Sequence, residues 1–489
     1  MNFIDLTVIV IYFIVLLLIG FALSSKITSA NEMFSAGGKS PWWISGISSY
    51  MTMFSAGTFV VWGGIAYRQG VVAITISMMF GVSAFIAGYL LAGKWKETNV
   101  ASAVEFIENK YGLPVVKMYT ILLMLTRIIG VAVAIYSLAV LVTSLVPLEE
   151  GNIFRSSVTG NFSTNIAILI IGIVVVLYTF SGGLWAVMVT DVMQFVVLMI
   201  AVIFMVPSII SKAGGATNII NNLPEGHLNL LSSPYTFFFL VGWVIIHVFK
   251  IGGEWAFVQR HLCVKTQKDA KKAAYLFGAL YLITPVLWMI PPIVFKAVNP
   301  SVNPEQAYIL ASQYALPTGM LGLVIAAMLS ATASMADSEL NVFAGALTSL
   351  YNSAKHNKLS EKQLLNVGKI TTIIIGAVIV FTSLMIPYLG GAEKLIVSIT
   401  SLFVGPMVLP TIWALFVKKV TPKHAYITVI VSGIASALLK FYLKNYSFFA
   451  NRMQIMDLIF GIAFPLLTLT ILTFIYNPKK ENIGTKDKY

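Results

Sequence analysis

The sequence predicts an all-α polytopic membrane protein with about 13 transmembrane helices, on three observations. Of its 489 residues, 58% are hydrophobic and only 10% are charged, whereas a soluble globular domain carries about a quarter charged residues. Apolar runs of roughly 20 residues, long enough to cross the hydrocarbon of a bilayer, recur along the whole chain. Because lipid offers the backbone no hydrogen bonds, and because these runs are too long for barrel strands, we expect helices throughout.

The expected helices leave no room for a soluble domain, so residues 1–489 are interpreted as a single transmembrane domain. The first helix, 5–25, is apolar and lacks the basic start of a signal peptide, so we interpret it as a membrane span. A cytoplasmic tail is expected at 477–489. The other spans are expected at 41–66, 71–93, 117–146, 164–180, 185–211, 234–256, 273–297, 316–351, 368–388, 394–417, 424–443 and 454–476.

The basic residues of the loops predict the orientation of the chain. An odd number of spans places the termini on opposite sides, and lysines and arginines concentrate on the inside. With the N-terminus outside, 22 of the 32 lysines and arginines, Arg260 among them, fall in inside segments and only eight in outside ones. We therefore expect a bacterial inner-membrane protein with its N-terminus outside and its C-terminus in the cytoplasm. The net charge of +13 then reflects topology, and no nucleic-acid partner is expected.

Small and polar residues interrupt two of the expected helices in mid-membrane. The second helix contains residues 54–59 (FSAGTF) and then Gly63-Gly64, and the seventh contains Gly252-Gly253-Glu254. Five helices separate the start of one from the start of the other. Broken helices at corresponding places in two halves are typical of inverted-repeat transporters. Glycine also marks close helix packing, but the matched positions and the adjacent polar residues favour breaks.

The ninth helix carries a polar stripe. Five of its residues recur at intervals that place them on one helical face, and they are Ser330, Ser334, Asp337, Ser338 and Asn341. Hydroxyl, carboxylate and amide oxygens inside a bundle suit a hard, partly dehydrated cation such as sodium. The alternative is a packing seam in which the serines bond back to their own helix, and Asp337 favours the functional interpretation.

Asp191, in the sixth helix, is a second mid-membrane carboxylate. Ionisable groups at this depth are costly and face a cavity or a partner. Asp191 belongs either to an ion pathway or to a buried structural network, in which it forms hydrogen bonds to nearby hydroxyls or backbone groups. Both interpretations remain open.

The remaining mid-membrane charges are basic or lie beside a basic residue. His247, Lys250 and Glu254 share one face of the seventh helix. Lys250 either holds an anionic group of a solute or neutralises Glu254 or Asp337. Arg127, in the fourth helix, is either a fork for a solute carboxylate or an interfacial residue whose head group reaches water.

No enzyme is indicated by the sequence. The five histidines form no H-E-x-x-H motif, and there is no G-x-S-x-G motif or phosphate-binding loop. The single cysteine, Cys263, excludes an intramolecular disulfide framework. Without a nucleotide site, the expected energy source is an ion gradient. The expected partners are a small-molecule solute, sodium ions and the lipid bilayer, with no organic cofactor and no obligatory protein partner.

Four stretches resemble the sodium/solute symporter family, which includes sodium–galactose, sodium–proline and sodium–sialic acid transporters. They are 41–59 (PWW to SAGTF), 181–194 (SGGLWAV, then TD and Q), 258–260 (VQR before a basic loop) and 322–341. The resemblance covers about residues 1–476 and implies the leucine-transporter fold, with a ten-helix core of 5+5 inverted repeats.

That core would place the first repeat at 41–212 and the second at 234–417. One extra helix, 5–25, would precede the core, and two C-terminal helices within 424–476 would follow it.

The resemblance also implies sodium sites between the first and eighth core helices. Positions that match the main site are Met51, Phe54, Ala331, Ser334 and Met335. Relatives usually have serine or threonine in place of Met335, so this chain lacks one expected oxygen. A second ion site of some relatives matches Asp191, Asp337 and Ser338. The extra carboxylate of Asp337 either strengthens ion binding or admits a proton.

The positions that line the sugar site of the sugar carriers diverge here. They correspond to Met53, Thr58, His247, Lys250 and Tyr281. Galactose is therefore not expected, and Lys250 with Arg127 favours a carboxylate-bearing solute over a neutral sugar. The expected function is sodium-coupled import of a small organic solute by alternating access. Proton coupling on the same fold and a transporter-like membrane sensor are the alternatives.

Overall fold

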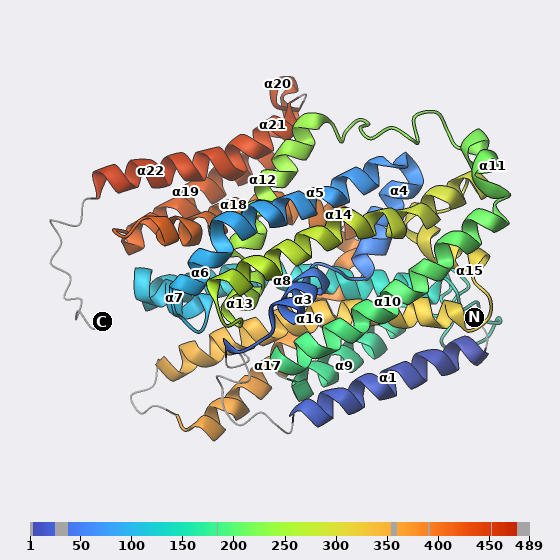
Figure 1. The fold of residues 1–489 in the computed structure, drawn as a ribbon, viewed down its shortest axis with the longest axis horizontal. Helices are drawn as coiled ribbons and strands as arrows, with labels where there is room; N and C mark the ends of the chain where they lie inside the picture. The colour runs from blue at the N-terminus through green and yellow to red at the C-terminus, as the bar shows by residue number, and fades with distance from the viewer. Residues whose placement is uncertain are drawn as a thin grey trace.

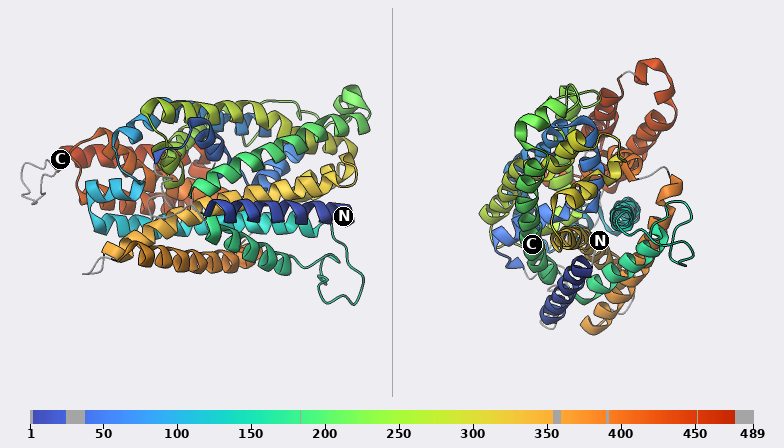
Figure 2. Two further views of the ribbon diagram at one scale, coloured as in Figure 1. Left: turned by 60° about the horizontal axis from the view of Figure 1, so that its bottom comes forward. Right: turned by 90° about the vertical axis from the view of Figure 1, so that its right-hand side faces the viewer.

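In the computed structural model the chain forms a bundle of long helices (Figure 1), described for residues 3–24, 38–182, 184–353, 359–389, 392–450 and 452–476. Within those residues, extended backbone pairs only as isolated bridges. Most long helices run along the longest axis of the molecule (Figure 2). The start of α1 (Phe3–Ser24) and the end of α22 (Phe464–Ile475) lie at opposite ends of the bundle. The prediction of an all-helical protein is confirmed.

The helices follow the apolar runs of the sequence. The first half of the chain contains α3 (Trp42–Thr52), η2 (Thr58–Trp62), α4 (Gly63–Gln69), α5 (Val72–Ala87), η3 (Gly88–Ala92), α6 (Gly93–Glu97), α7 (Ala103–Tyr111), α8 (Leu113–Thr143), α9 (Thr164–Gly182), α10 (Leu184–Lys212) and α11 (Gly215–Asn222). The second half contains α12 (Phe237–Gly253), α13 (Trp255–Leu262), α14 (Gln267–Val298), α15 (Ala307–Ala315), α16 (Met320–Ser353), α17 (Glu361–Met385), α18 (Ala392–Phe416), α19 (Pro422–Phe441), α20 (Ser447–Ala450), α21 (Met453–Leu458) and η7 (Ile459–Ala463), which leads into α22.

Seven helical segments of the described chain are long and apolar enough to cross a membrane singly, and the bent pair α12–α13 makes an eighth. Every span expected from the sequence overlaps one or more of the helices above. Further apolar helical stretches lie at Phe3–Tyr12 in α1, Thr164–Val176 in α9, Gly405–Phe416 in α18 and Ile459–Ile475 in η7 and α22. The total of 13 spans therefore stays a prediction.

Both helix breaks expected from the sequence are present. The α3 helix ends at Thr52, and the backbone leaves helical geometry over residues 53–55 before a π-helix begins at Thr58. The second break lies at Glu254, whose extended backbone (φ −75°, ψ 135°) separates α12 from α13. The axes of these two helices differ by 56°. Small and polar residues at 53–57 and 252–254 therefore interrupt the helices, as predicted.

The α16 helix is the most buried of the membrane-length helices. Of its most apolar 18-residue window, 83% is buried inside the protein, compared with at most 50% for the other such helices of the described chain. It packs against α8, α10 and α17, and α14 packs against α3 and α5. This placement explains why the polar stripe is found on α16: its side chains face other helices and are shielded from lipid.

Candidate functional site

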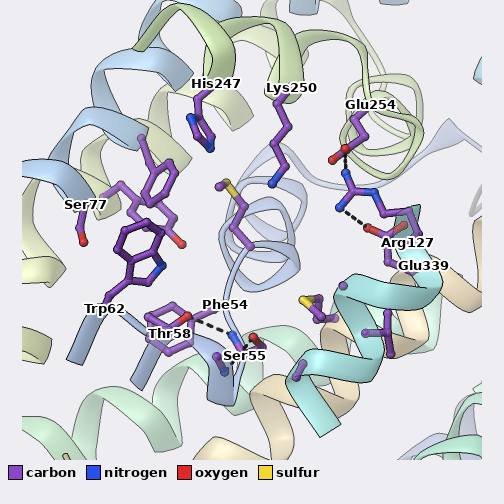
Figure 3. A pocket seen from close by; sticks show the side chains of 18 of the residues that line it. Phe54, Ser55, Thr58, Trp62, Ser77, Arg127, His247, Lys250, Glu254 and Glu339 are labelled. Carbon is purple, nitrogen blue, oxygen red and sulfur yellow. Dashed lines mark hydrogen bonds and ion pairs between the residues drawn. The ribbon is translucent and has the colours of Figure 1, made fainter. Parts of the chain in front are cut away.

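Both breaks contribute residues to one internal cavity of about 160 Å³ (Figure 3). A water molecule occupies about 30 Å³ in the liquid, so the space suits a small solute. All six residues expected to bind solute line this cavity, namely Met53, Thr58, Arg127, His247, Lys250 and Tyr281. Phe54 and Met335, expected in the main sodium site, line it as well. The structure thus brings the predicted solute residues together, and their role remains a prediction.

One side of the cavity is an aromatic wall, defined by Trp62, Phe80, Trp243 and Tyr281. The Phe80 ring centroid lies 5.7 Å from that of Trp243 and 5.3 Å from that of Tyr281, and the Trp62 and Trp243 centroids are 5.6 Å apart. Offset and edge-to-face contacts at this range are favourable for aromatic rings. The four rings pack on one another and present a continuous apolar surface.

The opposite side of the cavity carries a charge triad made of Arg127, whose side chain is 19% exposed, and the buried residues Glu254 and Glu339 (Figure 3). The Arg127 guanidinium is paired with Glu254 at the second break, and its Nη1 lies 3.3 Å from Glu339 Oε1 on α16. Arg127 therefore sits inside the bundle, and the interfacial interpretation does not fit its position. Glu254 Oε2 is buried and has no hydrogen-bond partner among the described residues.

Lys250 projects into the cavity between His247 and the triad (Figure 3). In the described part of the chain, no carboxylate oxygen lies within 4.0 Å of its ammonium group. The pair of Lys250 with Glu254, one alternative from the sequence, is not formed, because Glu254 pairs with Arg127. His247 Nδ1 lies 2.8 Å from the carbonyl oxygen of Trp243. A carbonyl only accepts, so Nδ1 carries the proton, and in the neutral ring Nε2 is left as an acceptor.

A second polar group, the Asp191 cluster, is fully enclosed by protein and consists of Ser48, Asp191, Arg260, Ser334 and Ser338. Asp191 accepts hydrogen bonds from the Ser334 hydroxyl and from Ser48 Oγ, the latter at 2.5 Å. Arg260 donates to Ser338 Oγ at 2.5 Å and to Ser48 Oγ at 3.2 Å. The cluster joins α3, α10, α13 and α16 at the centre of the protein. Each of its members is at most 1% exposed.

Arg260 also lies near further acidic side chains. Asp337 is 2% exposed and interacts electrostatically with the Arg260 guanidinium, as do Asp191 and Glu339. Acidic side chains from α10 and α16 therefore interact with this one guanidinium.

The polar stripe of α16 meets different partners along its length. The Ser330 hydroxyl bonds to Tyr12 on α1, whereas Ser334 and Ser338 belong to the Asp191 cluster. Asn341 Oδ1 is buried with no hydrogen-bond partner in the described chain. The sequence predicted one shared face for these residues, and the structure divides that face between a helix contact and the cluster.

The expected main sodium site lies where the first break meets α16. The backbone N–H of Phe54 donates to the Met51 carbonyl at 3.0 Å, which closes the end of α3. Two residues on, the Ala56 N–H donates to Thr332 Oγ1 of α16 at 2.9 Å. The Thr332 hydroxyl in turn donates to the Met328 carbonyl at 3.0 Å. Thr332 thereby holds the broken segment against α16.

Ser334 has a geometry compatible with ion binding. Its hydroxyl donates its only hydrogen to Asp191, and a serine oxygen retains lone pairs that accept. Ala331, the other residue expected from α16, is fully buried one turn before Met335. Met335 lines the cavity and supplies no side-chain oxygen.

Besides the aromatic residues Trp62, Phe80 and Trp243, four polar residues of these sites were not assigned a role from the sequence, namely Ser48, Arg260, Thr332 and Glu339. Arg260 was counted among the residues of an inside segment, but it lies in α13 and is 0% exposed. Glu339 and Thr332 lie on α16 outside the predicted stripe. The sequence did offer two signals, the VQR motif that ends at Arg260 and the position of the Glu339 carboxylate inside an expected span.

Comparisons with known proteins agree with this architecture. The sequence pattern that defines the sodium:solute symporter family matches residues 33–432. A sodium/glucose cotransporter from Vibrio parahaemolyticus is 27% identical, with 90% of this chain and 86% of the relative aligned. A sodium/sialic acid symporter from Aliivibrio fischeri is 24% identical, with 86% of this chain and 84% of that protein aligned.

Two solved structures have a similar fold. A Na⁺-coupled sialic acid symporter in a substrate-bound, outward-open state superposes with a TM-score of 0.82, covers 99% of both chains and is 22% identical. A nucleobase-cation-symport-1 family transporter with bromovinylhydantoin bound gives a TM-score of 0.56 at 16% identity, covering 93% of this chain and 98% of that one. These likenesses support sodium-coupled solute symport, with sodium as the coupling ion. The chain belongs to the sodium:solute symporter family, and it is a membrane transporter and not an enzyme.

Proposed function

We propose that this protein imports a small carboxylate-bearing solute together with sodium by alternating access. The observation that carries this proposal is Lys250. Its ammonium group faces the cavity with no carboxylate within 4.0 Å in the described chain, whereas Arg127 is already paired with two glutamates. The solute then supplies the anionic group that Lys250 lacks.

The physical reason is the cost of an unpaired charge at membrane depth. Charged side chains inside a bundle pair with one another or mark a substrate pathway. A hydrogen bond to a charged group contributes about 1.5–3 kcal/mol. A neutral sugar would leave the ammonium of Lys250 without an anion, so a carboxylate is the better match.

Sodium is proposed to bind near Met51, Phe54, Ala331 and Ser334, with a second ion position near Asp191, Asp337 and Ser338. The Asp191 carboxylate and the Ser334 hydroxyl that donates to it support this assignment, because hard cations bind oxygen ligands. The site borders the cavity, since Phe54 lines both, so ion and solute stabilise one another's position. A membrane potential of 100 mV supplies about 2.3 kcal/mol per charge, enough for roughly fiftyfold accumulation.

The proposed architecture is a 5+5 inverted-repeat core at 41–212 and 234–417, with 13 spans in all, the N-terminus outside and the C-terminus in the cytoplasm. Two breaks at corresponding places, both facing the cavity, support the repeat. In alternating access, the two halves would rock about the cavity and open it first outward and then inward.

The first experiment uses purified protein in liposomes. Pools of labelled monocarboxylates, amino acids, sialic acids and sugars are offered with and without an inward sodium gradient. We expect sodium-dependent accumulation of a carboxylate-bearing pool. Accumulation of sugars alone would overturn the solute class, and accumulation driven only by a pH gradient would replace sodium by protons.

The Lys250→Gln variant tests the residue that carries the proposal. Loss of a charge-assisted hydrogen bond of about 1.5–3 kcal/mol predicts a KM for the carboxylate roughly ten- to hundredfold higher. Lys268→Gln, which removes an exposed lysine outside the cavity, is the matched control and should leave the KM unchanged. An unchanged KM in Lys250→Gln would show that the solute anion is not bound there.

A further inference from the structure

The charges that line the cavity balance one another. Arg127 and Lys250 are basic, and Glu254 and Glu339 are acidic, so with ordinary ionisation their sum is zero. A solute that carries both charges leaves this balance intact, whereas a monoanion needs the charge of a bound cation to restore it.

Two groups of opposite sign offer contacts to a solute in the cavity. Lys250 has no carboxylate within 4.0 Å, and Glu254, which pairs with Arg127 through Oε1, has an Oε2 that is buried with no hydrogen-bond partner, both within the described chain. Glu254 follows Lys250 by four residues, directly after α12, and its N–H donates to the Lys250 carbonyl at 3.0 Å. The neutral His247 ring adds an acceptor on the other side of Lys250 (Figure 3).

The aromatic wall completes the outline of the solute. Trp62, Phe80, Trp243 and Tyr281 form a cluster of rings in which contacting pairs have centroids 5.3–5.7 Å apart. Such a surface suits a flat or bulky apolar group that lies against it. The many hydroxyls of a sugar would lose hydrogen bonds to water at this wall.

We infer that the solute is a zwitterionic α-amino acid with a large apolar, preferably aromatic, side chain. Its carboxylate binds the Lys250 ammonium, its ammonium binds Glu254 Oε2, and its side chain lies against the aromatic wall. This inference rests on the proposed function, because it specifies which carboxylate-bearing solute the same cavity takes.

The test compares four labelled compounds in proteoliposomes under an inward sodium gradient. They are phenylalanine, its amine analogue phenethylamine, its acid analogue 3-phenylpropanoate, and glycine, which keeps both charges and lacks the side chain. We expect uptake of phenylalanine at least tenfold faster than that of any of the other three. Lactate and N-acetylneuraminate are run in parallel as carboxylates of other kinds.

Each outcome has a separate meaning. If 3-phenylpropanoate, lactate or N-acetylneuraminate accumulates as fast as phenylalanine or faster, the zwitterion inference is wrong and the proposed function stands. If phenethylamine is the transported compound, both fall. Equal uptake of glycine and phenylalanine would show that the aromatic wall does not bind the solute side chain. If no carboxylate is taken up in a sodium-dependent way, the proposed function itself is wrong.

A variant separates the two charges of the solute. Glu254→Gln keeps an oxygen that accepts from Arg127 but loses the negative charge that faces the solute ammonium. We expect uptake of phenylalanine to fall at least tenfold and the preference for phenylalanine over 3-phenylpropanoate to be lost. A uniform decrease for both compounds, with the preference retained, would mean that Glu254 acts only on the fold and would overturn its assignment.

Discussion

The hydrogen bond between Ala56 and Thr332 offers a test of how the first helix break is held. Thr332→Val is nearly isosteric and removes only the hydroxyl that accepts the Ala56 N–H at 2.9 Å and donates to Met328. Thr332 is fully buried, so no water replaces the lost acceptor. The segment that carries Met51 and Phe54 then loses its hydrogen bond to α16.

The expected magnitude follows from the unsatisfied donor. A buried N–H without an acceptor costs about 1–3 kcal/mol. If the sodium-bound state depends on this bond, the sodium concentration for half-maximal uptake should rise roughly fivefold to a hundredfold, since about 1.4 kcal/mol corresponds to a factor of ten. The maximal rate at saturating sodium should change less.

The assay measures initial uptake against sodium concentration in proteoliposomes. Thr332→Ser keeps the hydroxyl in place and is the matched control, with an expected sodium dependence close to that of the parent protein. If Thr332→Val shows the parent sodium dependence, then the Ala56–Thr332 bond does not position the sodium site. A sodium dependence weakened equally by both substitutions would point to the shape of the side chain at position 332 and away from the hydrogen bond.

Two further predictions concern packing and pH. A methyl group at Gly405 would overlap the carbonyl oxygen of Gly461, so Gly405→Ala should separate α18 from η7 and destabilise the protein by about 1–3 kcal/mol. The thermal midpoint of unfolding in detergent should fall for Gly405→Ala and stay unchanged for Gly433→Ala, which has open space around it. Equal midpoints for the two variants would contradict the packing. Burial lowers the pKa of His227; a hydrogen bond to the Tyr67 carbonyl opposes this shift and the nearby Lys296 adds to it. The packing of loop 223–236 is therefore fully stable above the ordinary pKa of histidine, about 6.5, and weakens as the pH falls below it. Protease cleavage of that loop should increase between pH 7 and 5, and His227→Gln should remove the increase; a pH response retained in the variant would assign it to another group.

The helices and both breaks could be predicted from the sequence because each depends on local residues. Apolar runs of membrane length specify helices, and the small residues at 54–57 and 252–253 coincide with the interruptions in the structure. Lys250 and His247 could likewise be placed on one face, because a helical period is a local property. Both residues do line the cavity.

The partners of the charged residues could not be predicted, because they depend on which helices become neighbours. Arg127 had a solute carboxylate and the lipid interface as its candidate partners, and the structure pairs it with two glutamates from the second break and α16. Ser330 and Ser334 share a helical face, yet one meets α1 and the other meets α10. A period specifies a face, and only tertiary packing specifies what that face contacts.

Two arginines, one on α8 and one on α13, hold the bend between α12 and α13 at two points. Arg127 on α8 holds the corner itself through Glu254, and Arg260 fastens the short arm, α13, to α3 and α16. Straightening the bend between α12 and α13 would therefore break one or more of these contacts. Breaking a buried ion pair costs about 3–5 kcal/mol, close to the work that one or two charges do in crossing 100 mV at about 2.3 kcal/mol each. The contacts of Arg127 and Arg260 would then hold the bend until ions that cross the membrane supply enough free energy to break them.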